Sequence, residues 1–258
     1  MVNELFDVRG KVVLITGGSR GIGHMMARGF VAAGARVYIT SRKAEQCTAA
    51  AKELAREGEC YALPGDLARM EEIERVTAEL AAREPALHVL INNAGTQWGA
   101  TIDEFPEKGW DKVMDLNAKS PFFILQKLLP LLEAAARPED PARVINVSSV
   151  DGMHTPIFQN FSYAASKAAL NHLSRMLASH LAPRNITVNV IAPGPFHTDM
   201  LDPMVQSMGE DTVLANVPLK RMGNGDDAAG VAIFLASRAS AYVTGTVVPM
   251  DGGIFGAT

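Results

Sequence analysis

A glycine-rich turn between an apolar strand and a helix constrains the fold of this chain more than any other feature. Residues 12–16 are apolar on both faces, as a central strand of a parallel sheet is. Thr16-Gly-Gly-Ser-Arg-Gly-Ile-Gly23 follows, and a helical stretch then ends before Gly34. Any sharp strand-to-helix turn needs glycine, but glycines here also let the backbone approach a pyrophosphate beside the helix N-terminus. Because the turn is the first such junction in the chain, it predicts dinucleotide binding.

Strands and helices alternate along the rest of the chain. Further short β-branched runs occupy residues 36–40, 59–63, 88–92, 143–148, 186–191 and 246–250. Helical stretches occupy residues 44–57, 69–83, 109–136, 161–182 and 226–237, and Pro121 and Pro130 are expected to kink the third of these. Such alternation indicates a parallel sheet covered on both faces. We therefore expect an α/β fold: a single doubly wound, Rossmann-type domain over residues 1–258, with a seven-stranded, mostly parallel sheet.

Composition excludes several other classes of protein. The 258 residues are 48 % hydrophobic and 20 % charged, which is typical of a globular protein, and 24 basic against 28 acidic residues give a net charge of −4. That balance argues against a nucleic-acid partner. The only cysteines, Cys47 and Cys60, lack the spacing of a disulfide framework or a zinc site, and we expect reduced thiols and no metal. Without an apolar leader or a run of about 18 apolar residues, the sequence predicts a soluble, cytoplasmic protein with no membrane partner.

The end of the second predicted strand indicates which dinucleotide binds. An acidic residue about 20 positions beyond the glycines would accept hydrogen bonds from a free ribose 2′-hydroxyl. Ser41 stands near that position and Arg42 follows it, while Arg20 lies within the glycine-rich turn. Two guanidinium groups and a hydroxyl suit a 2′-phosphate, so we expect NADP(H) as the cofactor. The alternative is that Arg42 and Lys43 are an ordinary solvated pair of charges.

Tyr163 and Lys167 lie four residues apart, on one face of a predicted helix. A phenol titrates at about pH 10 and is a poor acid–base at neutral pH. We expect the neighbouring ammonium group to lower the pKa of Tyr163 and to make proton exchange with a carbonyl oxygen practical. Strand alternation turns only one of Ser148 and Ser149 toward such a site, where its hydroxyl could bind the substrate oxygen. Without a GxSxG turn or a partner histidine for either serine, hydrolysis is not expected.

In their order and spacing these motifs resemble the short-chain dehydrogenase/reductase family. The motifs are Thr16-Gly-x-x-x-Gly21-x-Gly23, Asn92-Asn-Ala-Gly95, Asn117, Ser149, Tyr163-x-x-x-Lys167, Pro193-Gly194 and Asp251-Gly-Gly253, which together span about residues 10 to 254. The resemblance implies that Tyr163 is the general acid, Lys167 its modulator and ribose anchor, and Ser149 the carbonyl orienter. It also implies that Asn117 holds a water that links Lys167 to solvent.

The resemblance further implies a set of cofactor contacts. Asp66 would contact the adenine, Asn93 would support the ribose and the central strand, and Thr198 would help fix which face of the nicotinamide is presented. With the two catalytic side chains Tyr163 and Lys167, the expected cofactor-binding residues are Gly17, Ser19, Arg20, Gly21, Ile22, Gly23, Ser41, Arg42, Asp66, Leu67, Asn93, Ala94, Gly95, Pro193, Gly194 and Thr198. Family members also suggest a homotetramer, or a homodimer, built on the helices at residues 109–136 and 161–182 and on the C-terminal strand.

Within that family the chain is most similar to the β-ketoacyl reductase branch, particularly its rhamnolipid-pathway type. The supporting segments are residues 16–23, 95–100, 109–114 and 141–146, whereas residues 151–160 and 195–199, where substrate would sit, depart from that type. We therefore expect reduction of a ketone, such as a 3-oxoacyl thioester, to a secondary alcohol. Oxidation of an alcohol or a sugar is the alternative, and a non-catalytic dinucleotide sensor is a remote one.

Several residues near the expected site allow two interpretations. Met200, Met204 and Met208 recur every four residues within a predicted substrate lid at residues 194–220. They would cover an apolar substrate or pack on the sheet or a neighbouring subunit. His154 and His197 would touch substrate or lie solvated in loops. Trp98 is expected at the rim of the pocket, and Trp110 in the core.

Overall fold

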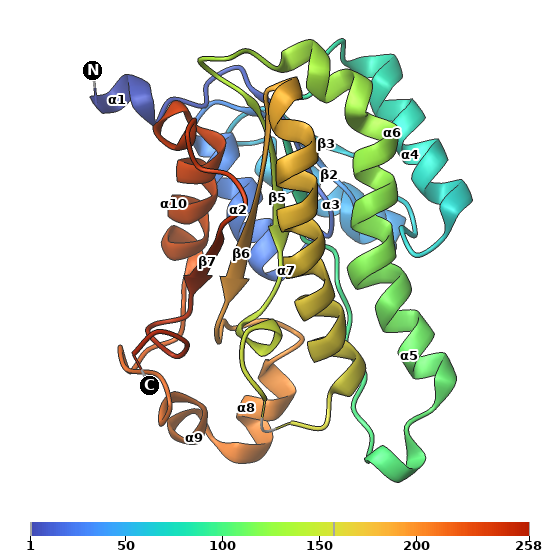
Figure 1. Cartoon of the computed structure of the whole chain (residues 1–258), viewed down its shortest axis with the longest axis vertical. Coiled ribbons are helices and arrows are strands. Elements are labelled where there is room, and N and C mark those ends of the chain that lie inside the picture. Colours follow the sequence, from blue (N-terminus) through green and yellow to red (C-terminus); the bar gives the residue numbers. More distant parts are fainter. Residues whose placement is uncertain (1, 157, 258) are drawn as a thin grey trace.

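The computed structural model describes residues 2–156 and 158–257, and one parallel sheet forms its centre (Figure 1). The strands run in the order β3-β2-β1-β4-β5-β6-β7, and each neighbouring pair is parallel. Their bounds are β1 Val12–Ile15, β2 Arg36–Ile39, β3 Cys60–Ala62, β4 Val89–Asn92, β5 Ala142–Val147, β6 Ile186–Pro193 and β7 Val247–Met250. The predicted α/β class and the seven-stranded, doubly wound sheet are confirmed.

Helices cover both faces of this sheet, and each face has its own apolar core. On one face α2 (Gly21–Ala32), α3 (Ala44–Leu54) and α10 (Gly225–Ala236) bury side chains such as Phe30 and Leu235. On the other face α4 (Met70–Arg83), α6 (Ser120–Ala135) and α7 (Phe161–Leu181) bury side chains such as Leu80 and Leu128. Because both faces of the central strands are covered, every residue of β1 and β4 is buried, as their hydrophobic runs predict.

The predicted long helix at residues 109–136 differs from expectation. It runs without a break from α5 (Glu107–Met114) through a π-helical turn at Asp115–Lys119 into α6. Pro121 lies two residues beyond the π turn, and Pro130 lies within α6. The irregularity is therefore the π turn, and this turn carries Asn117.

Parallel strands bring the segments that follow them to one edge of the sheet. In Figure 1 the arrowheads of β6 and β7 point toward α8 (Asp202–Met208) and α9 (Glu210–Leu214), which belong to the predicted lid. The glycine-rich turn follows β1 at the same edge, and the segments after β4 and β5 lie there too. This is the edge at which doubly wound sheets bind their ligands.

The remaining elements are short. They are α1 (Val2–Leu5) and the 3₁₀ turns Ile102–Glu104, Val150–Gly152, Ala182–Arg184 and Arg238–Ser240. Within the part of the chain that the structure describes, the helices are too short or too polar for any of them to span a bilayer.

Candidate active site

Ser149, Tyr163 and Lys167 meet at the carboxyl end of β5. Ser149 lies two residues beyond that strand, and α7 carries Tyr163 in its first turn and Lys167 one turn later. The Ser149 hydroxyl accepts from the Asp151 N–H at 3.1 Å and lies close enough to the Tyr163 phenol to lower its pKa. The Lys167 Nζ donates to the carbonyl of Val147 at 2.8 Å and lies 5.5 Å from the centroid of the Tyr163 ring. The structure thus brings together the three side chains expected to bind and protonate a carbonyl oxygen.

The expected lowering of the Tyr163 pKa is wrong for the cofactor-free chain. Burial raises the pKa of Tyr163 to about 12, the Asp151 charge raises it further, and the Ser149 hydroxyl opposes both effects. Lys167 does not offset this burial, because its ammonium group points to the Val147 carbonyl and lies over the ring. Burial also lowers the pKa of Lys167, to about 8. Tyr163 is therefore a phenol at neutral pH, the form that can donate a proton.

The π turn buries Asn117 against both α7 and the segment after β4. Its Oδ1 accepts from the Thr96 N–H at 2.9 Å, and its Nδ2 donates to the Thr96 carbonyl at 2.9 Å and to Ser166 Oγ at 3.0 Å. A Cβ placed on Gly95 would lie 3.4 Å from Asn117 Oδ1 and 3.6 Å from Lys167 Nζ, so these two groups face the same glycine. In this structure Asn117 therefore fixes the backbone beside Lys167.

The Asn93 side chain holds the backbone of the glycine-rich turn by hydrogen bonds. The Asn93 Nδ2 donates to the carbonyls of Thr16 at 2.9 Å and Gly17 at 3.1 Å. Gly17 has a φ of +67°, and a Cβ there would lie 2.9 Å from Ala94 Cα, while a Cβ on Gly23 would lie 2.3 Å from the Asn93 amide. Close packing on the segment after β4 thus requires glycine at these two positions, and a glycine-rich turn at the N-terminus of α2 fits the expected dinucleotide.

Cationic side chains lie at the adenosine end expected for the cofactor. Ser41 and Arg42 follow β2, next to the glycine-rich turn, whose Gly18 N–H donates to the Thr40 carbonyl at 3.1 Å. The side chains of Arg42 and Lys43 are exposed, and neither side chain forms a hydrogen bond or an ion pair with residues 2–156 or 158–257. Arg20, also exposed, is instead paired with Asp199 of the predicted lid. After β3, Asp66 is partly exposed and Leu67 is buried.

The segment after β6 lies beside the glycine-rich turn at the same edge of the sheet. Gly194 packs so tightly that a Cβ there would lie 2.8 Å from Asp251 Cα, and its N–H donates to the Met250 carbonyl at 3.0 Å. A Cβ on Gly21 would lie 3.2 Å from Thr198 Cγ2. Thr198 is therefore beside the glycine-rich turn, as expected for a residue that contacts the nicotinamide half of a dinucleotide. Ser19 and Ile22 of that turn are partly exposed.

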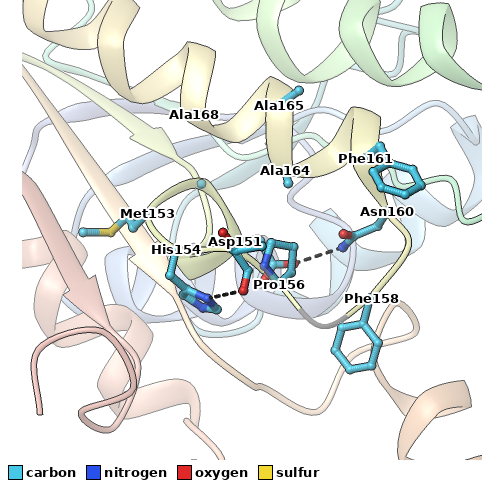
Figure 2. Close-up of a pocket in the computed structure, with 12 residues that line it drawn as sticks. Asp151, Met153, His154, Pro156, Phe158, Asn160, Phe161, Ala164, Ala165 and Ala168 are labelled. Carbon is cyan, nitrogen blue, oxygen red and sulfur yellow. Dashed lines mark hydrogen bonds between the residues drawn. The ribbon is translucent and has the colours of Figure 1, made fainter. Parts of the chain in front are cut away.

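A pocket of about 500 Å³ lies between residues 151–160 and α7 (Figure 2). Ala164, Ala165 and Ala168 of α7 form one wall, and the Asn160 Nδ2 donates to Asp151 Oδ2 at 3.0 Å. His154 lines this pocket but is exposed. The sequence signals neither the Asp151–Asn160 pair nor its place in the pocket, because the pairing depends on how the loop folds back.

The predicted lid exposes two of its regularly spaced methionines. Met200 and Met208 are exposed, and the side chain of Met204 lies outside the described residues. His197 lies 3.4 Å from an Asp202 carboxylate oxygen and 3.9 Å from a Glu210 one.

The expectation that Trp110 is a core residue is wrong, since 41 % of its surface is exposed beside Phe105. Trp98 is partly buried and packs on α5, where Lys112 Nζ lies 5.2 Å from its ring centroid. Cys47 and Cys60 are buried, free thiols whose pKa values are raised by burial, as expected. Over the described ranges, no three His, Cys, Asp or Glu side chains gather to hold a metal ion.

Comparisons with known proteins place this site among oxidoreductases. A family model described as enoyl-(acyl carrier protein) reductase matches residues 17–255. The chain is 47 % identical to the rhamnolipids biosynthesis 3-oxoacyl-[acyl-carrier-protein] reductase of Pseudomonas aeruginosa, over 98 % of this chain and 99 % of that protein.

Two solved structures are similar throughout. The Pseudomonas aeruginosa RhlG/NADP active-site complex has a TM-score of 0.95 at 45 % identity, covering 98 % of this chain and 99 % of that one. A gluconate 5-dehydrogenase from Burkholderia cenocepacia J2315 in complex with NADP and tartrate has a TM-score of 0.92 at 31 % identity, covering both chains completely.

Proposed function

The chain belongs to the short-chain dehydrogenase/reductase family, and we propose that it reduces the ketone of a 3-oxoacyl thioester, or of a similar carbonyl compound, to a secondary alcohol with NADPH. The observation that carries this proposal is the contact of Ser149, Tyr163 and Lys167 at the carboxyl end of β5. The relatives support it, since one is a 3-oxoacyl reductase and two similar structures hold NADP.

In the proposed reaction Tyr163 gives its phenolic proton to the ketone oxygen. When bound, NADPH supplies the hydride that reduces the carbonyl carbon. Hydrogen bonds from Ser149 and Tyr163 stabilise the negative charge that develops on the oxygen, so the two donors lower the barrier. A buried phenol with a pKa of about 12 is fully protonated at neutral pH, which suits reduction. With the cofactor bound, Lys167 would stabilise the phenolate left behind, and Asn117 keeps the backbone beside Lys167 in place.

The chain's own residues support NADP(H) over NAD(H). Arg20 of the glycine-rich turn and Arg42 after β2 are both exposed and would bind the 2′-phosphate, and Ser41 replaces the carboxylate that would repel it. The bare backbone of the glycine-rich turn would hold the pyrophosphate, and Lys167 would hold the ribose of the nicotinamide half. We expect the full set of cofactor residues predicted from the sequence to surround the bound dinucleotide.

We further propose that the protein is a cytoplasmic homotetramer, or a homodimer, of single-domain chains. Apolar side chains exposed on α5 and α7, namely Trp110, Phe161 and Met176, support an interface on these helices. The two free, buried cysteines are consistent with a reducing compartment.

The test follows NADPH oxidation at its own absorbance band, with 3-oxoacyl thioesters, simple ketones and keto-sugars offered in parallel. Turnover of the thioesters supports the proposal, and turnover of keto-sugars alone would move the substrate to the class named in the gluconate 5-dehydrogenase structure. Running the alcohol products with NADP⁺ tests the oxidative alternative. No turnover in either direction with bound NADPH would instead favour a dinucleotide sensor.

A further inference from the structure

An ion pair ties the glycine-rich turn to the predicted lid. Arg20 directly precedes α2, Asp199 follows Thr198 beyond β6, and the Arg20 guanidinium donates to the Asp199 carboxylate. The two residues are 179 positions apart in the sequence, and each side chain is 66 % exposed. The pair therefore crosses the edge of the sheet at which the dinucleotide would lie.

Two neighbouring contacts hold the same part of the lid. A Cβ on Gly21 would lie 3.2 Å from Thr198 Cγ2, and Gln97 Nε2 donates to the Met200 carbonyl at 3.3 Å. Residues 198–200 are thus attached both to the turn after β1 and to the segment after β4. Asp199 is held at Arg20 by this packing as well as by charge.

Arg20 differs in this respect from the other cations of the cofactor half. Arg42 and Lys43 have no partner in the described parts of the chain, so a phosphate could bind them at once. The Arg20 guanidinium, in contrast, already has a carboxylate on it, and a phosphate would have to replace that carboxylate. The other acids of the lid near this point, Asp202 and Glu210, face His197.

We propose that Asp199 competes with the cofactor's 2′-phosphate for Arg20 and thereby sets the affinity and selectivity for NADP(H). The inference rests on the proposed function, in which Arg20 is one of the ligands of that phosphate. In the cofactor-free enzyme Asp199 neutralises Arg20. When the cofactor binds, its 2′-phosphate pairs with the Arg20 guanidinium in place of the Asp199 carboxylate. Asp199 and its segment of the lid are then released.

The competition is measured by titrating the full-length protein with adenosine 2′,5′-bisphosphate and with 5′-AMP in a calorimeter. Asp199→Asn keeps the shape of the side chain and removes its charge, so the bisphosphate should bind about two- to fivefold more tightly, as expected for an exposed ion pair. The affinity for 5′-AMP, which lacks the 2′-phosphate, should stay the same. With the intact cofactors, the same variant should raise the ratio of kcat/KM for NADPH to that for NADH.

Asp202→Asn is the matched control, because it removes an equal charge from the lid without touching Arg20. If it strengthens bisphosphate binding as much as Asp199→Asn does, the effect is general repulsion and the competition is refuted. Arg20→Gln should weaken bisphosphate binding and abolish the effect of Asp199→Asn in the double variant. If Arg20→Gln leaves that binding unchanged, Arg20 does not bind the phosphate and the proposed cofactor mode fails. If it weakens binding but Asp199→Asn strengthens nothing, only the competition fails.

Discussion

The ionisation of Lys167 gives a pH dependence that can be worked out from the structure. Its ammonium group is buried, with 4 % of the residue exposed, and it donates to an uncharged carbonyl, that of Val147. Burial accordingly lowers its pKa to about 8. A lysine with that pKa is about 90 % charged at pH 7 and about 1 % charged at pH 10. If the reaction needs the ammonium form, raising the pH from 7 to 10 should slow it about 90-fold.

The assay is kcat/KM for NADPH at a fixed, low ketone concentration, which reports the ionisations of the cofactor-free enzyme. We expect a flat profile below pH 7 and a fall with a midpoint near the pKa of Lys167, toward a tenfold loss for each pH unit. Lys167→Arg keeps its charge to well above pH 10, so its profile should stay flat, at whatever lower rate the longer guanidinium allows. Lys127→Gln, which changes an exposed lysine paired with Glu74, should keep the wild-type profile. A wild-type profile that is flat to pH 10, or an equal fall in Lys167→Arg, would refute the reasoning.

Three further changes test other parts of the site. Tyr163→Phe removes the proposed acid, so kcat should fall by about 10²- to 10⁴-fold while titrations show that NADPH still binds; undiminished turnover would contradict the role of Tyr163. Arg42→Asp places a carboxylate beside the expected 2′-phosphate, so it should raise KM for NADPH and reduce the difference in KM between NADPH and NADH. Equal use of both cofactors by the unchanged protein would contradict the assignment. Asn117→Ala removes the two hydrogen bonds with the Thr96 backbone and the one to Ser166 Oγ in a buried place, so urea unfolding should show a loss of about 1–3 kcal/mol in the free energy of unfolding, and a loss near zero would mean that the π turn does not depend on this side chain.

The fold was predictable because it depends on patterns that are local in sequence. The expected strand at residues 88–92 is β4 (Val89–Asn92), and the expected helix at residues 161–182 is α7 (Phe161–Leu181). The π turn was not predictable, since residues 109–136 keep a helical composition throughout. Trp110 was misplaced for a similar reason: an aromatic at helical spacing favours burial, and only the packing of α5 shows that its ring lies outward.

Which residues come together at the site was easier to predict than how those residues ionise and pair. Spacing alone indicated that Tyr163 and Lys167 face the same way, and the structure agrees. The pKa of Tyr163 was predicted in the wrong direction, because spacing says nothing of burial or of the carbonyl that takes the Lys167 ammonium group. Arg20 was likewise expected to be available to a phosphate, and its partner lies 179 residues away, beyond the reach of any local pattern.

The wrong direction for the Tyr163 pKa and the unexpected partner of Arg20 concern the same physical quantity. It is the free energy of a charged side chain before the cofactor binds. Burial keeps Tyr163 neutral and lowers the pKa of Lys167, and the Asp199 carboxylate neutralises the exposed Arg20. A phosphate-bearing cofactor alters each balance, because it brings negative charge to Arg20 and hydrogen-bond acceptors to Lys167. We therefore expect NADPH binding to add to the stabilisation of the Lys167 and Arg20 charges, while burial by itself keeps Tyr163 in the protonated form that the proposed reaction uses.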